Sequence, residues 1–158
     1  VAVCQLRCIF TGGELPVWLK RLKFMAASCL LLTFLTVVFV LAPMNGESGL
    51  YMLLCTSSML YHHLLNPMAA LLSYLLLERE PHLPRSDVRW ALLPTLAYAA
   101  VILPLNILRV IVGPYPFFEV YHQPVYVSVL WAVGLLGVNY LYAWLLWRLG
   151  GGRPRSAR

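Results

Sequence analysis

Charged residues are scarce in this sequence. They make up 11% of its 158 residues, whereas a soluble domain carries about 25%. Apolar residues make up 61% of the chain, and the mean hydropathy is +0.75. This balance excludes an ordinary soluble domain and indicates an integral membrane protein.

Metal and cofactor motifs are missing as well. The four cysteines lack the paired spacing of a zinc site, so we interpret them as free thiols. Zinc requires three or four nitrogen, sulfur or carboxylate ligands, which the one histidine pair of the chain does not supply. A bis-histidine haem needs ligands from opposite sides, and only one apolar segment contains histidine. No phosphate-binding glycine loop is present. We therefore expect no metal and no cofactor.

Four long apolar segments predict an all-α fold, a polytopic transmembrane helix bundle with four full spans. The segments cover about residues 24–42, 50–77, 90–112 and 125–147. We interpret 1–158 as a single membrane domain, in which 1–23 is the tail of a preceding span plus a cytoplasmic loop. The first ten residues do not have the organisation of a signal peptide, so we expect the chain to be an N-terminally incomplete piece of a longer protein.

The basic residues predict how the bundle is oriented. The net charge is +6, but the basic residues collect at span ends and do not form a stripe for nucleic acid. Eleven of the twelve Lys and Arg residues lie on one side of the predicted spans. Cytoplasmic loops are the ones enriched in these residues. We expect no nucleic-acid partner, contact with membrane lipid, and a multi-pass protein of the cell membrane with both ends and the 78–89 loop in the cytoplasm.

Two adjacent histidines are the strongest candidates for chemistry. His62 and His63 lie in an uncharged 29-residue run, about 20 Å from its start at a helical rise of about 1.5 Å per residue. Ionisable residues at that depth are functional candidates. Ser58, His62 and Asn66 share one helix face. A neutral imidazole there suits a general base, with Ser58 and Asn66 orienting it or the substrate. The alternative is a hydrogen bond that joins two helices.

Hydroxyl and charged side chains complete the set of candidates. Thr33 and Thr36 lie in the middle of the first span and could serve as nucleophiles, although such residues commonly bond a backbone carbonyl one turn back. Arg109 is the one cation predicted within a span, and Asn106 shares its face. Arg109 either extends toward the membrane surface or, with Glu119 and His122, lines an outer mouth that holds a carboxylate or an ester carbonyl.

At these residues the chain resembles the androgen-induced-protein-like family of six-span membrane proteins, and its uncharacterised bacterial branch most closely. The resemblance rests on four motifs between Lys20 and Trp147: Thr33 to Phe39 with Ala42-Pro43, His62 to Pro67 followed by Glu78, Leu93 to Tyr98, and Tyr115 to Glu119.

The resemblance implies two further spans before this chain and an intramembrane hydrolase of fatty-acid esters that uses a threonine and a histidine. The family's histidine corresponds to His62, with His63 as the alternative, and its threonine falls in the preceding region. The leading hypothesis is therefore a lipid-ester hydrolase with His62 as general base and a fatty-acid ester as substrate. The alternative is a non-enzymatic membrane protein, namely a transporter of small solutes or lipid, a sensor or an assembly partner.

Overall fold

The computed structural model describes residues 15–77, 83–113 and 115–150, and within these ranges every regular element is a helix. The all-α class predicted from the sequence is confirmed. The residues expected to form the tail of a preceding span, part of the 78–89 loop and the basic C-terminal tail lie outside the described ranges.

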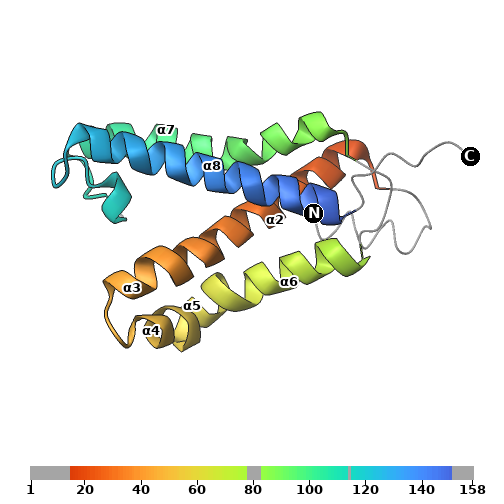
Figure 1. The fold of residues 1–158 in the computed structure, drawn as a ribbon, viewed down its shortest axis with the longest axis horizontal. Coiled ribbons are helices and arrows are strands. Elements are labelled where there is room, and N and C mark those ends of the chain that lie inside the picture. Colours follow the sequence, from red (N-terminus) through yellow and green to blue (C-terminus); the bar gives the residue numbers. More distant parts are fainter. Residues whose placement is uncertain (1–14, 78–82, 114, 151–158) are drawn as a thin grey trace, which may run out of the picture.

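Three helices are long and apolar enough to cross a membrane. The first is formed by α2 (Val17–Thr36), η1 (Val37–Leu41) and α3 (Ala42–Met44); the second by η4 (Arg85–Leu92) and α7 (Leu93–Ile107); the third is α8 (Val125–Leu149). They contain the expected spans 24–42 and 125–147 and most of 90–112. These helices are compatible with an integral membrane protein, and α2 is the central one (Figure 1).

The expected span 50–77 is not one continuous helix, so four full spans are not confirmed. Its pieces are α4 (Gly49–Cys55), α5 (Ser57–Met59), η2 (Leu60–Leu65), α6 (Asn66–Leu72) and η3 (Ser73–Leu77). Thr56 has an extended backbone (φ −103°, ψ 135°), and Ser57 has a positive φ of 43°. The Thr56 hydroxyl donates to the Met52 carbonyl at 2.5 Å. Hydroxyls that bond nearby backbone compete with the helical ladder, which explains the break at this Thr-Ser-Ser sequence.

Prolines account for two of the wide helical turns. Pro43 and Pro67 each lie two residues after a π-helical segment, η1 and η2 respectively. At the end of each segment a backbone N–H bonds the carbonyl five residues earlier, from Ala42 to Val37 and from Asn66 to Tyr61. A proline ring cannot donate a hydrogen bond and clashes with the carbonyl four residues before it. The wider turn relieves this clash without breaking the helix.

The third expected span ends earlier than predicted, at Ile107. The Arg109 N–H bonds the Asn106 carbonyl at 2.9 Å, and the Val110 N–H bonds the Leu105 carbonyl at 2.9 Å. This is the Schellman pattern, and Arg109 occupies its left-handed position with a φ of 57°. Arg109 therefore lies in the turn after the helix and not within the span.

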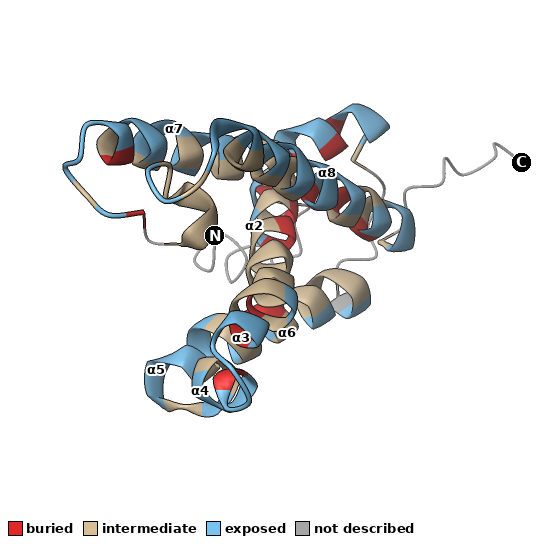
Figure 2. Cartoon of the chain, turned by 60° about the vertical axis from the view of Figure 1, so that its left-hand side comes forward, coloured by how far each residue is buried: buried red, intermediate tan, exposed pale blue. Residues whose placement is uncertain are grey.

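The tightest packing lies where α2, η4 and α8 meet. Phe24 and Ala27 of α2, Val88 and Ala91 of η4 and Ala143 of α8 form a buried cluster. Figure 2 shows the buried residues concentrated along α2 and at its crossing with α8, whereas α4 and α5 are mostly exposed. The helices therefore cross at one end of the bundle, where small side chains allow close approach.

Asn139 joins three helices beside this cluster. Its Oδ1 accepts a hydrogen bond from the Ser28 hydroxyl of α2 at 3.1 Å, and its Nδ2 donates to the Thr95 hydroxyl of α7 at 2.8 Å. Its Nδ2 also lies 3.4 Å from the carbonyl oxygen of Ala91. Asn139 and Ser28 are fully buried. The sequence places this amide deep in the last apolar segment, where it is expected to bond across helices, and the structure confirms this expectation.

We predict that Asn139→Leu lowers the free energy of unfolding by about 1–2 kcal/mol, because it removes interhelical hydrogen bonds and leaves the Ser28 hydroxyl buried without an acceptor. Thermal unfolding in detergent measures the change. Tyr140→Phe is the matched control, because Tyr140 is the exposed neighbour on the same helix. Equal melting temperatures for Asn139→Leu and the control would contradict the role of Asn139.

Candidate functional site

The loop after α7 folds back over the bundle and is held there by Asn106. The Asn106 side chain is buried, donates to the Ile111 carbonyl at 3.1 Å and accepts from the Val120 N–H at 3.2 Å. Gly113 permits the close return, since a Cβ atom there would lie 2.6 Å from the carbonyl carbon of Phe118. Asn106, a candidate for site lining, therefore has a structural role that positions this loop.

The returning loop carries a cluster of aromatic rings on the short helix η5 (Pro116–Phe118). Tyr115 and Phe117 stack with centroids 5.1 Å apart. The ring centroids of Phe117 and Trp131 of α8 are 5.7 Å apart. The ring of Phe118 meets that of Tyr98 of α7 edge-on, with centroids 5.8 Å apart. Aromatic pairs at these separations hold one another in place. The cluster thus forms a fixed wall between α7 and α8.

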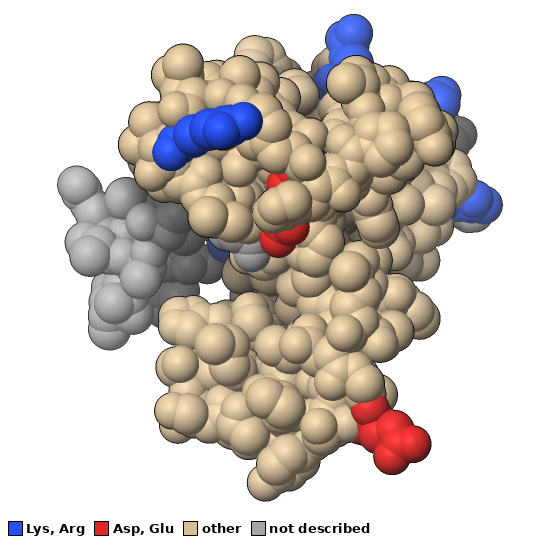
Figure 3. Space-filling view, turned by 90° about the vertical axis from the view of Figure 1, so that its left-hand side faces the viewer, with Lys and Arg blue, Asp and Glu red and all other residues tan. Residues whose placement is uncertain are grey.

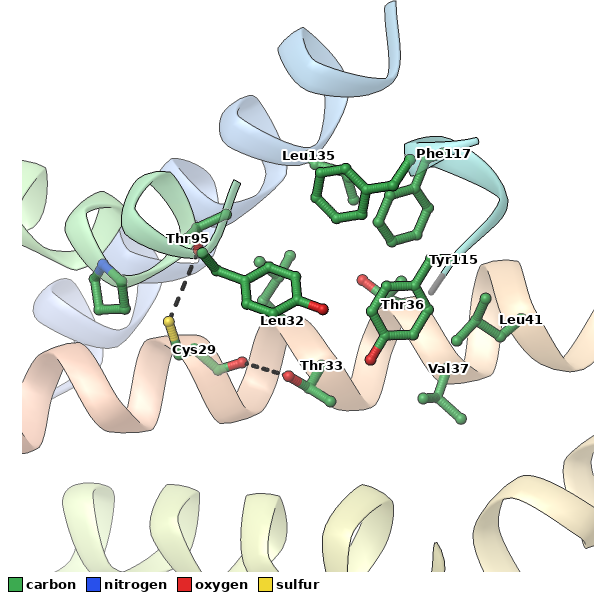
Figure 4. Close-up of a pocket in the computed structure, with 13 residues that line it drawn as sticks. Cys29, Leu32, Thr33, Thr36, Val37, Leu41, Thr95, Tyr115, Phe117 and Leu135 are labelled. Carbon is green, nitrogen blue, oxygen red and sulfur yellow. Dashed lines mark hydrogen bonds between the residues drawn. The ribbon is translucent and has the colours of Figure 1, made fainter. Parts of the chain in front are cut away.

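One side of this wall faces a cavity of about 270 Å³, here named the first chamber. Figure 4 shows its lining side chains converging from α2, α7, α8 and η5. Most of the lining is apolar, and the polar members are Cys29, Thr33, Thr36, Thr95 and two tyrosines. The sequence-predicted candidates Thr33 and Thr36 therefore meet in one cavity.

The polar groups of the first chamber differ in how they are bonded. The Thr33 hydroxyl donates to the Cys29 carbonyl at 3.0 Å, so it bonds one turn back along its own helix. The Cys29 sulfur lies 3.8 Å from the Thr95 hydroxyl. The Thr36 hydroxyl has no hydrogen-bond partner among the described residues. Thr36 is thus the threonine of this chamber whose hydroxyl is free to contact a ligand.

A second chamber of about 520 Å³ lies between α7 and α8. It shares Thr95, Phe117, Phe118 and Leu135 with the first chamber, so the two cavities adjoin. Its walls are mostly apolar, and besides Thr95 its hydroxyl residues are Tyr121 and Ser128. The Ser128 hydroxyl oxygen is buried and has no partner among the described atoms. Together the chambers form an apolar space within the part of the bundle expected to lie in the membrane.

At the C-terminal end of α7 a third cavity of about 460 Å³, here named the mouth cavity, is lined by the charged candidates. It is lined by Asn106, Arg109, Glu119 and His122, together with Tyr121 and the chain at 110–112. The Nδ1 atom of His122 lies 2.8 Å from the Glu119 carboxylate. Within the described residues Glu119 therefore pairs with His122 and not with Arg109. Figure 3 looks onto this end, where a basic side chain crosses the upper lobe with acidic atoms below it, while other charged side chains lie at the edge of the view and on the lower lobe.

The two histidines lie in η2, directly before α6, and line neither the chambers nor the mouth cavity. Figures 1 and 4 show α6 and its neighbours on one side of α2 and the first chamber on the other. His63 Nδ1 lies 3.0 Å from the Leu53 carbonyl oxygen, a contact that spans the break before α5. The hypothesis of an intramembrane general base predicts a buried His62, but His62 is exposed and has no hydrogen-bond partner among the described residues. Ser58 and Asn66 are exposed as well.

The structure therefore separates the candidates into three groups. It brings Thr33 and Thr36 together in the first chamber, and Asn106, Arg109 and Glu119 together at the mouth cavity. It does not bring Ser58, His62, His63 and Asn66 into either cavity. Sequence reasoning passed over Thr95, Tyr98 and Trp131 as site residues. The signal that could have found them is the aromatic Tyr-Pro-Phe-Phe loop, which needs partner rings on neighbouring helices.

The described residues define an all-helical protein with apolar, hydroxyl-bearing chambers between its long helices. In comparisons with known proteins, no family model matches the chain, and no curated protein or solved structure matches it.

Ser57, at the break between α4 and α5, has a strained backbone because its φ is positive. A left-handed conformation costs a residue other than glycine about 1 kcal/mol, so Ser57→Gly should raise the free energy of unfolding by about that amount. Ser58→Gly is the matched control, because Ser58 is helical and glycine there should lower the free energy of unfolding by about 1 kcal/mol. Chemical or thermal unfolding in detergent distinguishes the two variants. A loss of stability in both would show that Ser57 is not strained.

Proposed function

We propose that this chain is an integral protein of the cell membrane that binds the acyl chain of a lipid or fatty ester in its two adjoining chambers. The observation that carries the proposal is the apolar space walled by the rigid aromatic cluster between α7 and α8. Ligand sites are commonly cavities of about 300–1,000 Å³ with apolar linings and few polar groups. The chambers fit this description at a depth where lipid is the abundant ligand.

The proposed orientation places the ends of the chain in the cytoplasm. In Figure 1 the start of α2, the start of η4 and the end of α8 lie at one end of the bundle. Arg21 and Asp87 form an ion pair of 2.6 Å between the first two of these elements. Charged residues at that end and their scarcity at the other agree with cytoplasmic enrichment in Lys and Arg. The mouth cavity would then face outward.

Ester hydrolysis is a second candidate function, favoured by the unpaired imidazole of His62 and the resemblance to the androgen-induced-protein-like family. In this proposal His62 is the general base, and Ser58 and Asn66 on the same exposed face orient it or the substrate. The first chamber lies across α2 from His62, so Thr36 is not the nucleophile that His62 would activate. The family likeness assigns the nucleophile to a threonine of a preceding span, which would approach His62 from its exposed side.

Blocking the chambers tests the binding proposal. Leu135 lines both chambers, so Leu135→Trp should reduce chain binding about tenfold or more by filling them. The measurement is photolabelling in nanodiscs by methyl palmitate that carries a diazirine on its chain, followed by peptide mapping. Leu145→Trp is the matched control, because Leu145 is exposed on the same helix and lines neither chamber.

Labelled peptides are expected from α2, α7 and η5. Labelling spread evenly over lipid-facing residues, or equal labelling of the two tryptophan variants, would contradict the binding proposal.

Labelling with a fluorophosphonate probe tests the hydrolase proposal. We predict labelling of the wild-type protein, expressed together with the preceding span that the proposal requires, and a loss of at least tenfold in His62→Ala at equal expression, because activation of the nucleophile requires the base. Thr36→Val should retain the labelling. Absence of labelling in the wild type would contradict hydrolysis without affecting the binding proposal.

A further inference from the structure

The selectivity of the chambers for one lipid over another must come from outside them. Lipid tails are as apolar as leucine side chains, so moving an acyl chain from the bilayer into an apolar chamber gains little free energy. Nearly all lipids carry similar chains. A polar contact at the headgroup is therefore needed to decide which lipid is held.

The mouth cavity is placed to provide this contact. Tyr121 lines both the second chamber and the mouth cavity, so the two spaces adjoin at its ring. The Tyr121 hydroxyl donates to the Ile107 carbonyl at 2.5 Å, which fixes the ring against the end of α7. An amphiphile with its chain in the second chamber would therefore present its headgroup to the residues of the mouth cavity.

Arg109 is the charge at this mouth that is left for a ligand. Its guanidinium carbon lies 4.4 Å from the centroid of the Tyr121 ring. Stacking on a ring face leaves the N–H donors of the guanidinium plane free at its edge. Among the described residues no carboxylate pairs with Arg109, because the nearby Glu119 is engaged by His122. A planar, oriented and unpaired guanidinium suits an anion that accepts two hydrogen bonds.

The backbone at Arg109 gives an independent reason to assign it a function. The left-handed position of a Schellman motif is usually glycine, because a Cβ atom is unfavourable there. Arg109 adopts this conformation with a φ of 57° and contributes no ion pair within the described residues. Strained residues of this kind concentrate at functional sites.

We propose that Arg109 and Tyr121 form a headgroup site that selects lipids with an anionic group, a carboxylate or a phosphate, next to the acyl chain. The proposal rests on the proposed binding of an acyl chain in the chambers. Neutral esters enter the chambers but are held less tightly, because they lack the charge that the guanidinium pairs with.

The test compares three photoreactive ligands with the same diazirine-bearing palmitoyl chain: palmitic acid, palmitoyl lysophosphatidic acid and methyl palmitate. Labelling is measured with the full chain in nanodiscs of uncharged lipid at alkaline pH, so that the carboxyl group of palmitic acid is ionised. We expect at least one anionic ligand to label the chamber peptides about tenfold more strongly than the methyl ester. A preference for only the phosphate or only the carboxylate identifies the source of the anion.

Arg109→Gln should abolish this preference, because labelling by the anionic ligands falls to the level of the methyl ester when the charge that pairs with them is removed. Arg148→Gln is the matched control, because Arg148 also stacks on a ring, that of Trp144 at 5.3 Å, but lies at the opposite end of α8. This control should keep the wild-type preference. Arg109→Gly adds a check on folding, because it should lose the preference while its melting temperature stays equal to or above that of the wild type.

Equal labelling by the three ligands in the wild type, or an undiminished preference in Arg109→Gln, would overturn the headgroup site while leaving chain binding intact. Failure of every ligand to label the chambers would overturn both proposals.

Discussion

The hydrogen bonds of Asn139 are the interaction on which the arrangement of the helices depends. In an apolar medium an unpaired amide is costly, so Asn139 must find its partners on neighbouring helices. It finds them in Ser28 of α2 and Thr95 of α7, beside a cluster of small buried residues. This fixes the crossing of three helices at one end of the bundle. From that point α2 diverges from α7 and α8 (Figure 1).

Divergence of the helices creates the space that the aromatic loop then divides. Rings of Tyr115, Phe117 and Phe118 enter from the open end and pack against Tyr98 and Trp131. They do not fill it completely, and two adjoining chambers are left. The apolar cavities thus result from two features: the helices cross closely at one end, and the aromatic loop packs between them at the other. The charged mouth lies where that same loop begins.

The segment 50–77, which carries the histidines, has an irregular backbone. Its helix is interrupted at Thr56 and Ser57 and widened before Pro67, so several backbone groups leave the regular ladder. His63 satisfies one of them by its contact with Leu53. Irregular backbone within a membrane is tolerated where it is covered by protein or lines a wet cavity. His62 is exposed beside this irregular backbone, so this face would need a polar or protein-covered environment at membrane depth.

The sequence alone determined the all-helical class, three of the apolar helices and the interhelical role of Asn139. These follow from local properties, namely run length, hydropathy and the cost of an unpaired amide. It did not determine that the segment 50–77 is broken, because hydropathy records composition and not whether Thr56 keeps a helical backbone. The sequence also did not determine that Arg109 lies beyond the end of α7. That end depends on the Asn106 side chain, which bonds Ile111 and Val120 of the returning loop.

Only the tertiary structure decided which candidates meet. Thr95 lies far along the sequence from Thr33 and Thr36, and the three meet because α2 and α7 pack together, whereas η2, the segment that carries His62, lies with α6 on the other side of α2. Helical periodicity assigns a residue to a face but does not say which neighbour that face meets. That choice is made by the packing of α2 between its neighbours, and it separates the chambers from the histidines.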